Sequence, residues 1–196
     1  MVSSATHGDE EILIPVAVGR KLKHLKDEDS LSVGSRAELL FQVREVSAHC
    51  IRLRVEDLLN RRDYSSSELS QKLRDDGYFA SVVDSYISRL QEIGLLDDRR
   101  FADVFVRSKL SCGWGRAKIE RELSRRGIAV SDLSGWPDDY FTDEDELGRA
   151  FDLASRRRLT GKNDFQKLVR FLCSRGFSMG ISMDAARRVL SEDGSD

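Results

Sequence analysis

The chain is poor in the residues that cross-link a small protein or anchor it in a membrane. Its 196 residues include three cysteines, Cys50, Cys112 and Cys173, which are odd in number and form no CxxC pair. This usage predicts reduced thiols in a cytosolic protein and argues against structural zinc. The apolar stretch Ile12 to Val18 is too short to span a bilayer and follows acidic residues, the wrong charge for a secretory signal. We therefore expect a soluble, cytoplasmic protein that does not associate with a membrane and binds no metal or cofactor.

The groups that most often carry catalysis are also scarce. All three histidines, His7, His24 and His49, precede residue 50, so the rest of the chain lacks a histidine base. The adjacent pair Asp97-Asp98 suits a helix N-cap better than paired catalytic carboxylates, because neighbouring residues diverge on a helix. The segment Gly113-Trp114-Gly115 lacks the lysine and spacing of a phosphate loop and indicates a helix break, with Trp114 either stacked on a nucleic-acid base or buried. These features favour a binding protein over an enzyme.

One short pattern occurs three times. Each copy has an apolar residue, a leucine four positions later, a glycine four positions after that, and then a second apolar residue. The copies are Leu69-Leu73-Gly77-Tyr78, Ile119-Leu123-Gly127-Ile128 and Leu168-Leu172-Gly176-Phe177, and they lie 50 and 49 residues apart. The spacing predicts a helix that ends in a left-handed glycine, with the last apolar residue folded back onto the leucine. A regular period of this length predicts a helical repeat protein.

Apolar residues at helical spacing predict the remaining elements. We expect helices over about 36–60, 65–76, 82–94, 98–110, 116–126, 145–159, 164–175 and 181–190, and a turn at 27–30. The segment Gly135-Trp136-Pro137 interrupts the position of a further helix, because proline removes a backbone donor. The expected fold is all-α, with three tandem three-helix repeats in an elongated arrangement. Its parts are an extension over 1–50, with a strand at Ile12–Val18, then repeat 1 (51–98), repeat 2 with an acidic linker (99–144), and repeat 3 with an acidic tail (145–196).

Charge is distributed unevenly along the chain, although the net charge is only −2. Residues 97–131 carry nine basic and five acidic residues, and residues 148–190 carry ten basic and three acidic residues. Between them, residues 132–147 carry seven acidic residues and no basic one. Two basic blocks of this kind suit a polyanionic partner. The acidic segment either shields them by imitating phosphate or is a solvated linker.

Basic residues recur on the predicted outward faces of repeats 2 and 3. They lie opposite the apolar positions of their helices and must face solvent or a partner. The candidates are Lys118, Arg121 and Arg125 in repeat 2, and Arg149, Arg156, Lys167, Arg170 and Arg175 in repeat 3. An ordinary solvated face is the alternative, but the recurrence of one sign on successive units favours contact with DNA or an acidic partner. We do not expect the predicted helix over 82–94 to recognise a specific DNA sequence, since its outer face offers one cation and one anion.

The ordered motifs from about Ile51 to Leu190 resemble the RecX regulators of bacterial recombinase filaments. The segments that carry the resemblance are Arg61-Arg62-Asp63-Tyr64-Ser65 with Glu68-Leu69, Gly94-Leu95-Leu96-Asp97-Asp98-Arg99-Arg100-Phe101-Ala102, Glu122-Leu123 with Arg126-Gly127-Ile128, and Arg170-Phe171-Leu172 with Arg175-Gly176-Phe177-Ser178. The long start and the interruption at 135–137 depart from the family pattern.

The resemblance implies a non-enzymatic protein that lies in the groove of the RecA filament on DNA and restrains its ATPase and strand exchange. The implied partners are a RecA-type recombinase filament and single-stranded or double-stranded DNA, with the chain itself expected to be a monomer. A basic outer face suits such a groove, because it displays phosphate as well as protein. The alternative from another class is a stand-alone, non-specific nucleic-acid-binding module, whose binding would depend steeply on salt.

Overall fold

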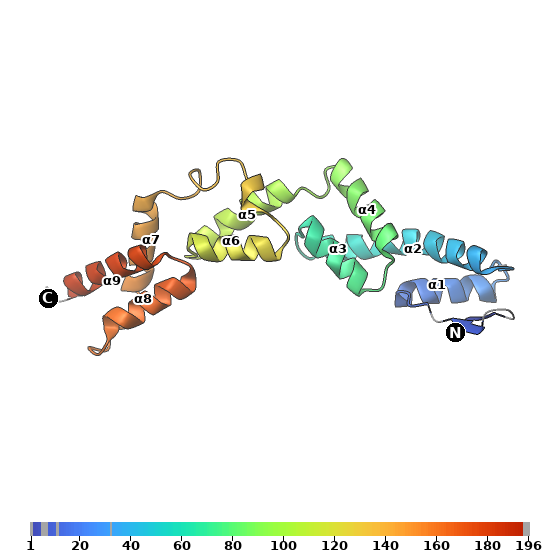
Figure 1. The fold of residues 1–196 in the computed structure, drawn as a ribbon, viewed down its shortest axis with the longest axis horizontal. Helices are drawn as coiled ribbons and strands as arrows, with labels where there is room; N and C mark the ends of the chain where they lie inside the picture. The colour runs from blue at the N-terminus through green and yellow to red at the C-terminus, as the bar shows by residue number, and fades with distance from the viewer. Residues whose placement is uncertain (1, 5–7, 11, 32, 194–196) are drawn as a thin grey trace. The chain divides into compact units, whose positions relative to one another are not determined.

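The regular secondary structure of the described residues is almost entirely helical (Figure 1). The computed structural model describes residues 2–4, 8–10, 12–31 and 33–193. The chain divides into two compact units, Met1–Asp97 and Asp98–Asp196. The all-α class predicted from the sequence is confirmed, with one short hairpin beside the helices. The last residues of the predicted acidic tail, 194–196, lie outside the described residues.

The first unit is a helical cluster preceded by the hairpin. Its elements are β1 (Val2–Ser4), β2 (Gly8–Glu10), α1 (Val16–Asp27), α2 (Arg36–Leu59), α3 (Ser66–Asp75) and α4 (Ala80–Glu92). The two strands pair antiparallel, with Val2 opposite Glu10. Helix α1 packs on α2, and α4 packs on both α2 and α3. One apolar core, from Val18 to Leu96, joins all four helices.

The second unit contains two separate apolar cores. Its elements are α5 (Asp98–Ser111), α6 (Arg116–Arg125), the 3₁₀ turn η1 (Val130–Asp132), α7 (Asp143–Ser155), α8 (Asp164–Arg175) and α9 (Met179–Asp193). One core gathers Ala102 to Phe141 and the other gathers Ala150 to Val189. The predicted interruption at Gly135-Trp136-Pro137 is confirmed, because turns replace a third α-helix there. Trp136 instead packs edge-on against Phe141, with 5.3 Å between ring centroids.

All three predicted helix caps are confirmed. Gly77, Gly127 and Gly176 have φ values of +93°, +72° and +96°, which an L side chain rarely adopts. In each cap the amide after the glycine donates to the carbonyl of the leucine. These bonds join Tyr78 to Leu73, Ile128 to Leu123 and Phe177 to Leu172, at 3.2, 3.0 and 3.2 Å. The glycine amide adds the second bond of a Schellman motif in every copy. The three apolar residues that follow the glycines are buried.

The strand predicted at Ile12–Val18 is wrong. Residues 12–15 are irregular, and α1 begins at Val16, directly after Pro15, whose φ of −56° suits a helix start. A short apolar run does not by itself distinguish a strand from a helix. The helical spacing continues through Leu22 and Leu25, which pack beside the fully buried Val18 on the core. That spacing was the signal for this helix.

The capping glycine of α3 lies against the segment that leads into α1. A Cβ atom built on Gly77 would lie 3.4 Å from the Pro15 nitrogen and 3.5 Å from the Ile14 carbonyl carbon. The residues that precede α1 therefore cover the end of α3. The extension belongs to the core of the first unit, which is the arrangement that an array of small modules needs at its ends.

Asp76, at the C-terminal end of α3, is held by basic residues. Its carboxylate accepts hydrogen bonds from Arg54 of α2 at 2.7 Å and pairs with Lys72 at 3.2 Å. Partial burial alone would raise the pKa of Asp76, but these two partners outweigh it and hold that pKa below its usual value. The lowered pKa means that the carboxylate stabilises the fold above the ordinary aspartate range, and that this contribution is lost as the pH falls through the folded-state pKa.

Asp76→Asn is therefore expected to lower the free energy of unfolding by about 1 kcal/mol at neutral pH. The difference from the parent protein should shrink as the pH falls from about 4, the ordinary aspartate pKa, through the lower folded-state pKa, below which the aspartate is protonated in both states. Urea unfolding at several pH values measures this. Asp75→Asn is the matched control, since Asp75 is exposed and accepts from Gln71 alone. Equal losses in the two variants would contradict the assignment.

Candidate binding surface on residues 98–196

The basic residues predicted on α6 lie in three different settings. Arg121 is exposed, and its Nε donates to the Ala117 carbonyl at 3.3 Å. Arg125 is 76% exposed but pairs with Glu122 at 2.9 Å. Lys118 is half-buried, and its Nζ lies 4.1 Å from the centroid of the Trp114 ring. All three side chains lie away from the buried face of Ile119, as predicted. Of the three, only Arg121 is exposed and forms neither an ion pair nor a ring contact among the described residues.

Helix α8 shows the same variety. Lys167 is 54% exposed and pairs with Asp164 at 3.3 Å. Arg170 is exposed, and no ion pair or ring contact involves it among the described residues. Arg175 is half-buried at the end of the helix, with its guanidinium carbon 5.4 Å from the centroid of the Phe171 ring.

The two candidates on α7 separate from each other. Arg156 follows the last residue of the helix and is exposed. Arg149 does not face solvent as predicted: its Nε and Nη2 atoms are buried without a hydrogen-bond partner, and its guanidinium lies 5.5 Å from the Phe141 ring. The reason is the turn at 135–141, which brings Phe141 over this side of α7. Arg149 is therefore removed from the open surface.

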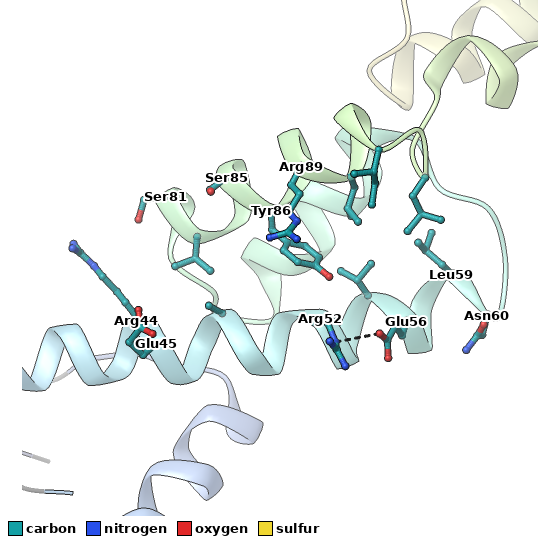
Figure 2. Close-up of a pocket in the computed structure, with 16 residues that line it drawn as sticks. Arg44, Glu45, Arg52, Glu56, Leu59, Asn60, Ser81, Ser85, Tyr86 and Arg89 are labelled. Atoms are coloured by element: carbon teal, nitrogen blue, oxygen red, sulfur yellow. Dashed lines mark ion pairs between the residues drawn. The ribbon is translucent and has the colours of Figure 1, made fainter.

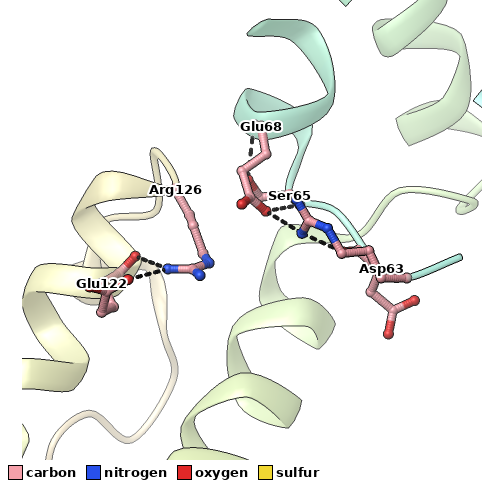
Figure 3. Close-up of polar contacts among 6 residues, drawn as sticks. Asp63, Ser65, Glu68, Glu122 and Arg126 are labelled. Atoms are coloured by element: carbon pink, nitrogen blue, oxygen red, sulfur yellow. Dashed lines mark hydrogen bonds and ion pairs between the residues drawn. The ribbon is translucent and has the colours of Figure 1, made fainter. Parts of the chain in front are cut away.

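Several of the motif residues prove to stabilise local structure. Figure 3 shows Glu122 beside Arg126, joined by a 2.7 Å ion pair, and this contact holds the pKa of Glu122 below its usual value. The same figure shows the capping box at the start of α3, in which Ser65 accepts from the Glu68 amide at 3.1 Å. Arg62 stacks 3.7 Å from the Tyr64 ring and pairs with Glu68 at 3.3 Å. These residues fix helix ends.

Helix α6 begins directly on the C-terminal end of α8. The amides of Gly115 and Ala117 donate to the carbonyls of Arg175 and Gly176, at 2.9 and 3.1 Å. The first amides of a helix need partners outside the helix, and Gly115 has no side chain to supply one. Because the carbonyl end of α8 meets the amide end of α6, the two helix dipoles also attract. We call this contact the α6/α8 junction.

The α6/α8 junction depends on glycine at both sides. A Cβ atom on Gly115 would lie 2.4 Å from the carbonyl carbon of Gly176, and one on Gly176 would lie 2.4 Å from the Lys118 Cβ. The buried carboxylate of Glu146 completes the site by accepting from the Arg116 amide at 3.4 Å. Helices α6 and α8, which lie about 50 residues apart in the sequence, are thereby joined through their backbones.

Two more cations beside the junction were not among the candidates predicted from the sequence. The Nζ atom of Lys109 lies 5.3 Å from the centroid of Trp114, and the guanidinium carbon of Arg157 lies 4.7 Å from that of Phe171. Trp114 is half-buried against Phe105. Of the two alternatives left open for Trp114, the structure therefore favours burial for most of its ring. Spacing along one helix does not reveal the Arg157 contact, because Phe171 lies on α8, whereas Lys109 also lies 5.2 Å from the ring of Phe105, one turn earlier on α5.

A groove lies between α2 and α4, and the sequence did not indicate it. Figure 2 shows Tyr86 and Arg89 from α4 facing Arg52 and Glu56 of α2 across it. It encloses about 960 Å³, and the exposed Ile93 stands beside it. Its charged lining is nearly balanced, with Arg44, Arg52 and Arg89 against Glu45 and Glu56. It therefore lacks the excess of basic over acidic residues found on α6 and α8.

The fold and these surfaces define an all-α protein with basic helices and with two small modules known from other proteins. The family models for "RecX, first three-helix domain" and "RecX, second three-helix domain" match residues 52–90 and 97–132. "Regulatory protein RecX" of Chromohalobacter salexigens is 41% identical over 125 residues, which cover 61% of this chain and 80% of the relative. That of Halorhodospira halophila is 36% identical over 142 residues, covering 69% and 85%. The chain belongs to the RecX family of regulatory proteins.

Solved structures support the same fold. A crystal structure of regulatory protein RecX aligns with a TM-score of 0.61 and 23% identity, covering 81% of this chain and 84% of the other. RecX from Lactobacillus salivarius aligns with a TM-score of 0.61 and 20% identity, covering 73% and 96%. Among the described residues, no helix is long and apolar enough to cross a membrane.

Proposed function

We propose that this protein is a non-enzymatic regulator that binds the RecA recombinase filament on DNA and inhibits its ATPase and strand-exchange activities. Membership of a family of regulatory proteins supports regulation of RecA. The observation that carries the DNA part is the exposure of cations on α6 and α8, with Arg121 and Arg170 outside any ion pair among the described residues. Such cations bind phosphate by releasing counterions.

We further propose that the working units are repeat 1 (51–98), repeat 2 (99–144) and repeat 3 (145–196). Three separate apolar cores support a division into three units, although the first core also includes Val18 and the part of α2 that precedes residue 51. Small modules joined by backbone contacts, such as the α6/α8 junction, suit a groove that winds along a filament. The protein acts as a cytoplasmic monomer in this proposal, and its partner is the filament, which displays both protein and phosphate.

The test is single-stranded-DNA-dependent ATP hydrolysis by the cognate recombinase, measured with increasing amounts of this protein. Inhibition at substoichiometric amounts is the expected result, since one regulator acts on a filament of many subunits. Unchanged hydrolysis together with tight, strongly salt-dependent binding to naked DNA would contradict the proposal. That outcome would favour the stand-alone nucleic-acid-binding module, a function that the basic helices also support.

A further inference from the structure

Apart from exposed cations such as Arg121 and Arg170, the cations of residues 98–196 that a neighbouring side chain holds can be grouped by the kind of group that holds them. In the first class a carboxylate lies within ion-pair distance. Its members include Arg107 with Asp103, Arg116 with Glu120, Arg125 and Arg126 with Glu122, and Lys167 with Asp164. In the second class an aromatic ring takes the place of the carboxylate. Around the α6/α8 junction its members are Lys109 and Lys118 on Trp114, and Arg157 and Arg175 on Phe171.

The two classes differ in the charge that they offer to a third group. A carboxylate neutralises its cation, so an incoming phosphate must compete with it or displace it. A ring attracts the cation through its quadrupole and carries no net charge. A ring-held cation has therefore already lost part of its side-chain freedom before an anion binds, but it keeps its full positive charge. Both properties favour binding to an anion.

The backbone brings the two ring clusters together. Gly115, which directly follows Trp114, donates to the carbonyl of Arg175 at 2.9 Å. Lys118 packs its stem on Gly176, so closely that a Cβ atom on that glycine would lie 2.4 Å from its own. Phe171 lies one turn before Arg175 on α8. The four ring-held cations are thus gathered around one junction from three helices and the end of α7.

The acidic groups near the junction are already engaged. Glu146 is buried and accepts from the Arg116 amide, while Glu120 pairs with the Arg116 side chain at 2.9 Å. Among the described residues, no carboxylate forms an ion pair with any of the four ring-held cations. In the described part of the chain, the junction therefore gathers four cations without a direct ion-pair partner around one buried carboxylate, Glu146, whose hydrogen-bond partner is a backbone amide.

We propose that Lys109, Lys118, Arg157 and Arg175 form a binding site for the phosphate backbone of single-stranded DNA. This inference rests on the proposed function, which brings the chain to a filament on DNA. The half-buried rings of Trp114 and Phe171 hold the cations and add aromatic surface beside the backbone, the combination that single-strand binding uses. The site shares only Lys118 and Arg175 with the set predicted by helix faces. It adds Lys109 and Arg157 and leaves out the other six predicted residues, which are Arg121, Arg125, Arg149, Arg156, Lys167 and Arg170.

The experiment compares two double variants of the full chain by fluorescence anisotropy with a labelled oligothymidylate over a range of salt concentrations. Lys118→Gln with Arg175→Gln removes one cation from each ring. Each lost phosphate contact lowers the slope of log affinity against log salt by about 0.7, so the slope should fall by about 1.4 and the affinity at 0.1 M salt by about 25-fold. The matched control is Arg107→Gln with Arg187→Gln, which removes two carboxylate-held cations, paired with Asp103 and Asp184, and should leave the slope unchanged. Circular dichroism verifies that all variants are folded.

The same variants are then measured in the recombinase ATPase assay. The two assays together distinguish a failure of the junction site from a failure of the proposed function. Equal slopes for the two double variants would overturn the junction site, even where wild-type inhibition of the ATPase upholds the proposed function. A loss of inhibition with unchanged DNA binding would also overturn it, by assigning the four cations to an acidic protein surface. A lowered slope without any wild-type effect on the recombinase supports the DNA site and contradicts the proposed function.

Discussion

Gly115→Ala is expected to destabilise residues 98–196 by about 3 kcal/mol. The new methyl group would lie 2.4 Å from the Gly176 carbonyl carbon and from the Phe177 nitrogen, so α6 and α8 must move apart. Overpacking of this kind costs about 1–3 kcal/mol, and loosening two backbone hydrogen bonds adds to it. The backbone of Gly115, with φ −84° and ψ 164°, is open to alanine. The loss of stability therefore measures the close contact with Gly176 and Phe177 and not strain in the backbone of residue 115.

Urea unfolding gives the free energy, and hydrogen exchange at the amides of Gly115 and Ala117 locates the change. Gly148→Ala is the matched control, because no atom lies within 4 Å of a Cβ at that position in α7. Alanine inside a helix should stabilise the protein by about 0.5–1 kcal/mol relative to glycine. A Gly115→Ala variant as stable as the parent, with both amides still protected, would contradict the close backbone contact.

Leu172→Ala should cost about 3–4 kcal/mol, the largest effect of a single truncation that we expect in repeat 3. Leu172 is fully buried and accepts the capping hydrogen bond from Phe177 at its carbonyl. Removing a buried leucine side chain loses its transfer free energy and leaves a cavity. The backbone bond of the cap survives the substitution, so the loss measures packing alone.

Hydrogen exchange followed by mass spectrometry is the readout, with Leu73→Ala as the equivalent change in the first unit. Leu172→Ala should raise exchange in α7, α8 and α9, and Leu73→Ala should raise it in α3 and α4. Unchanged protection of α8 and α9 in Leu172→Ala would show that the cap leucine is not the centre of its core, contrary to the repeat model.

The caps were predictable because each is a local device. A leucine, a glycine and an apolar residue at fixed spacing determine the bonds of a Schellman motif without help from distant parts of the chain. The same holds for α8, whose bounds of Asp164–Arg175 match the prediction. Helix α1 was missed because a short apolar run was assigned as a strand, although Val18 and Leu22 continue at helical spacing.

The candidate surface was predictable only in part. Helix periodicity correctly kept Lys118, Arg121 and Arg170 away from the buried faces, but it does not tell which partner a cation finds. Arg149 is covered by Phe141, and the α6/α8 junction joins residues 115 and 175 through backbone atoms. Contacts of this kind depend on how segments distant in the sequence pack, so no spacing within one helix encodes them.

The most direct test of the account is the inhibition of recombinase ATP hydrolysis by a charge-reversed protein, Lys118→Glu with Arg121→Glu, Lys167→Glu and Arg170→Glu. All four side chains lie away from the buried faces of α6 and α8, so circular dichroism should find the helices retained. The account predicts that wild-type protein suppresses single-stranded-DNA-dependent ATP hydrolysis and that the folded variant does not. Equal inhibition by the two proteins would contradict the assignment of regulation to the basic helices.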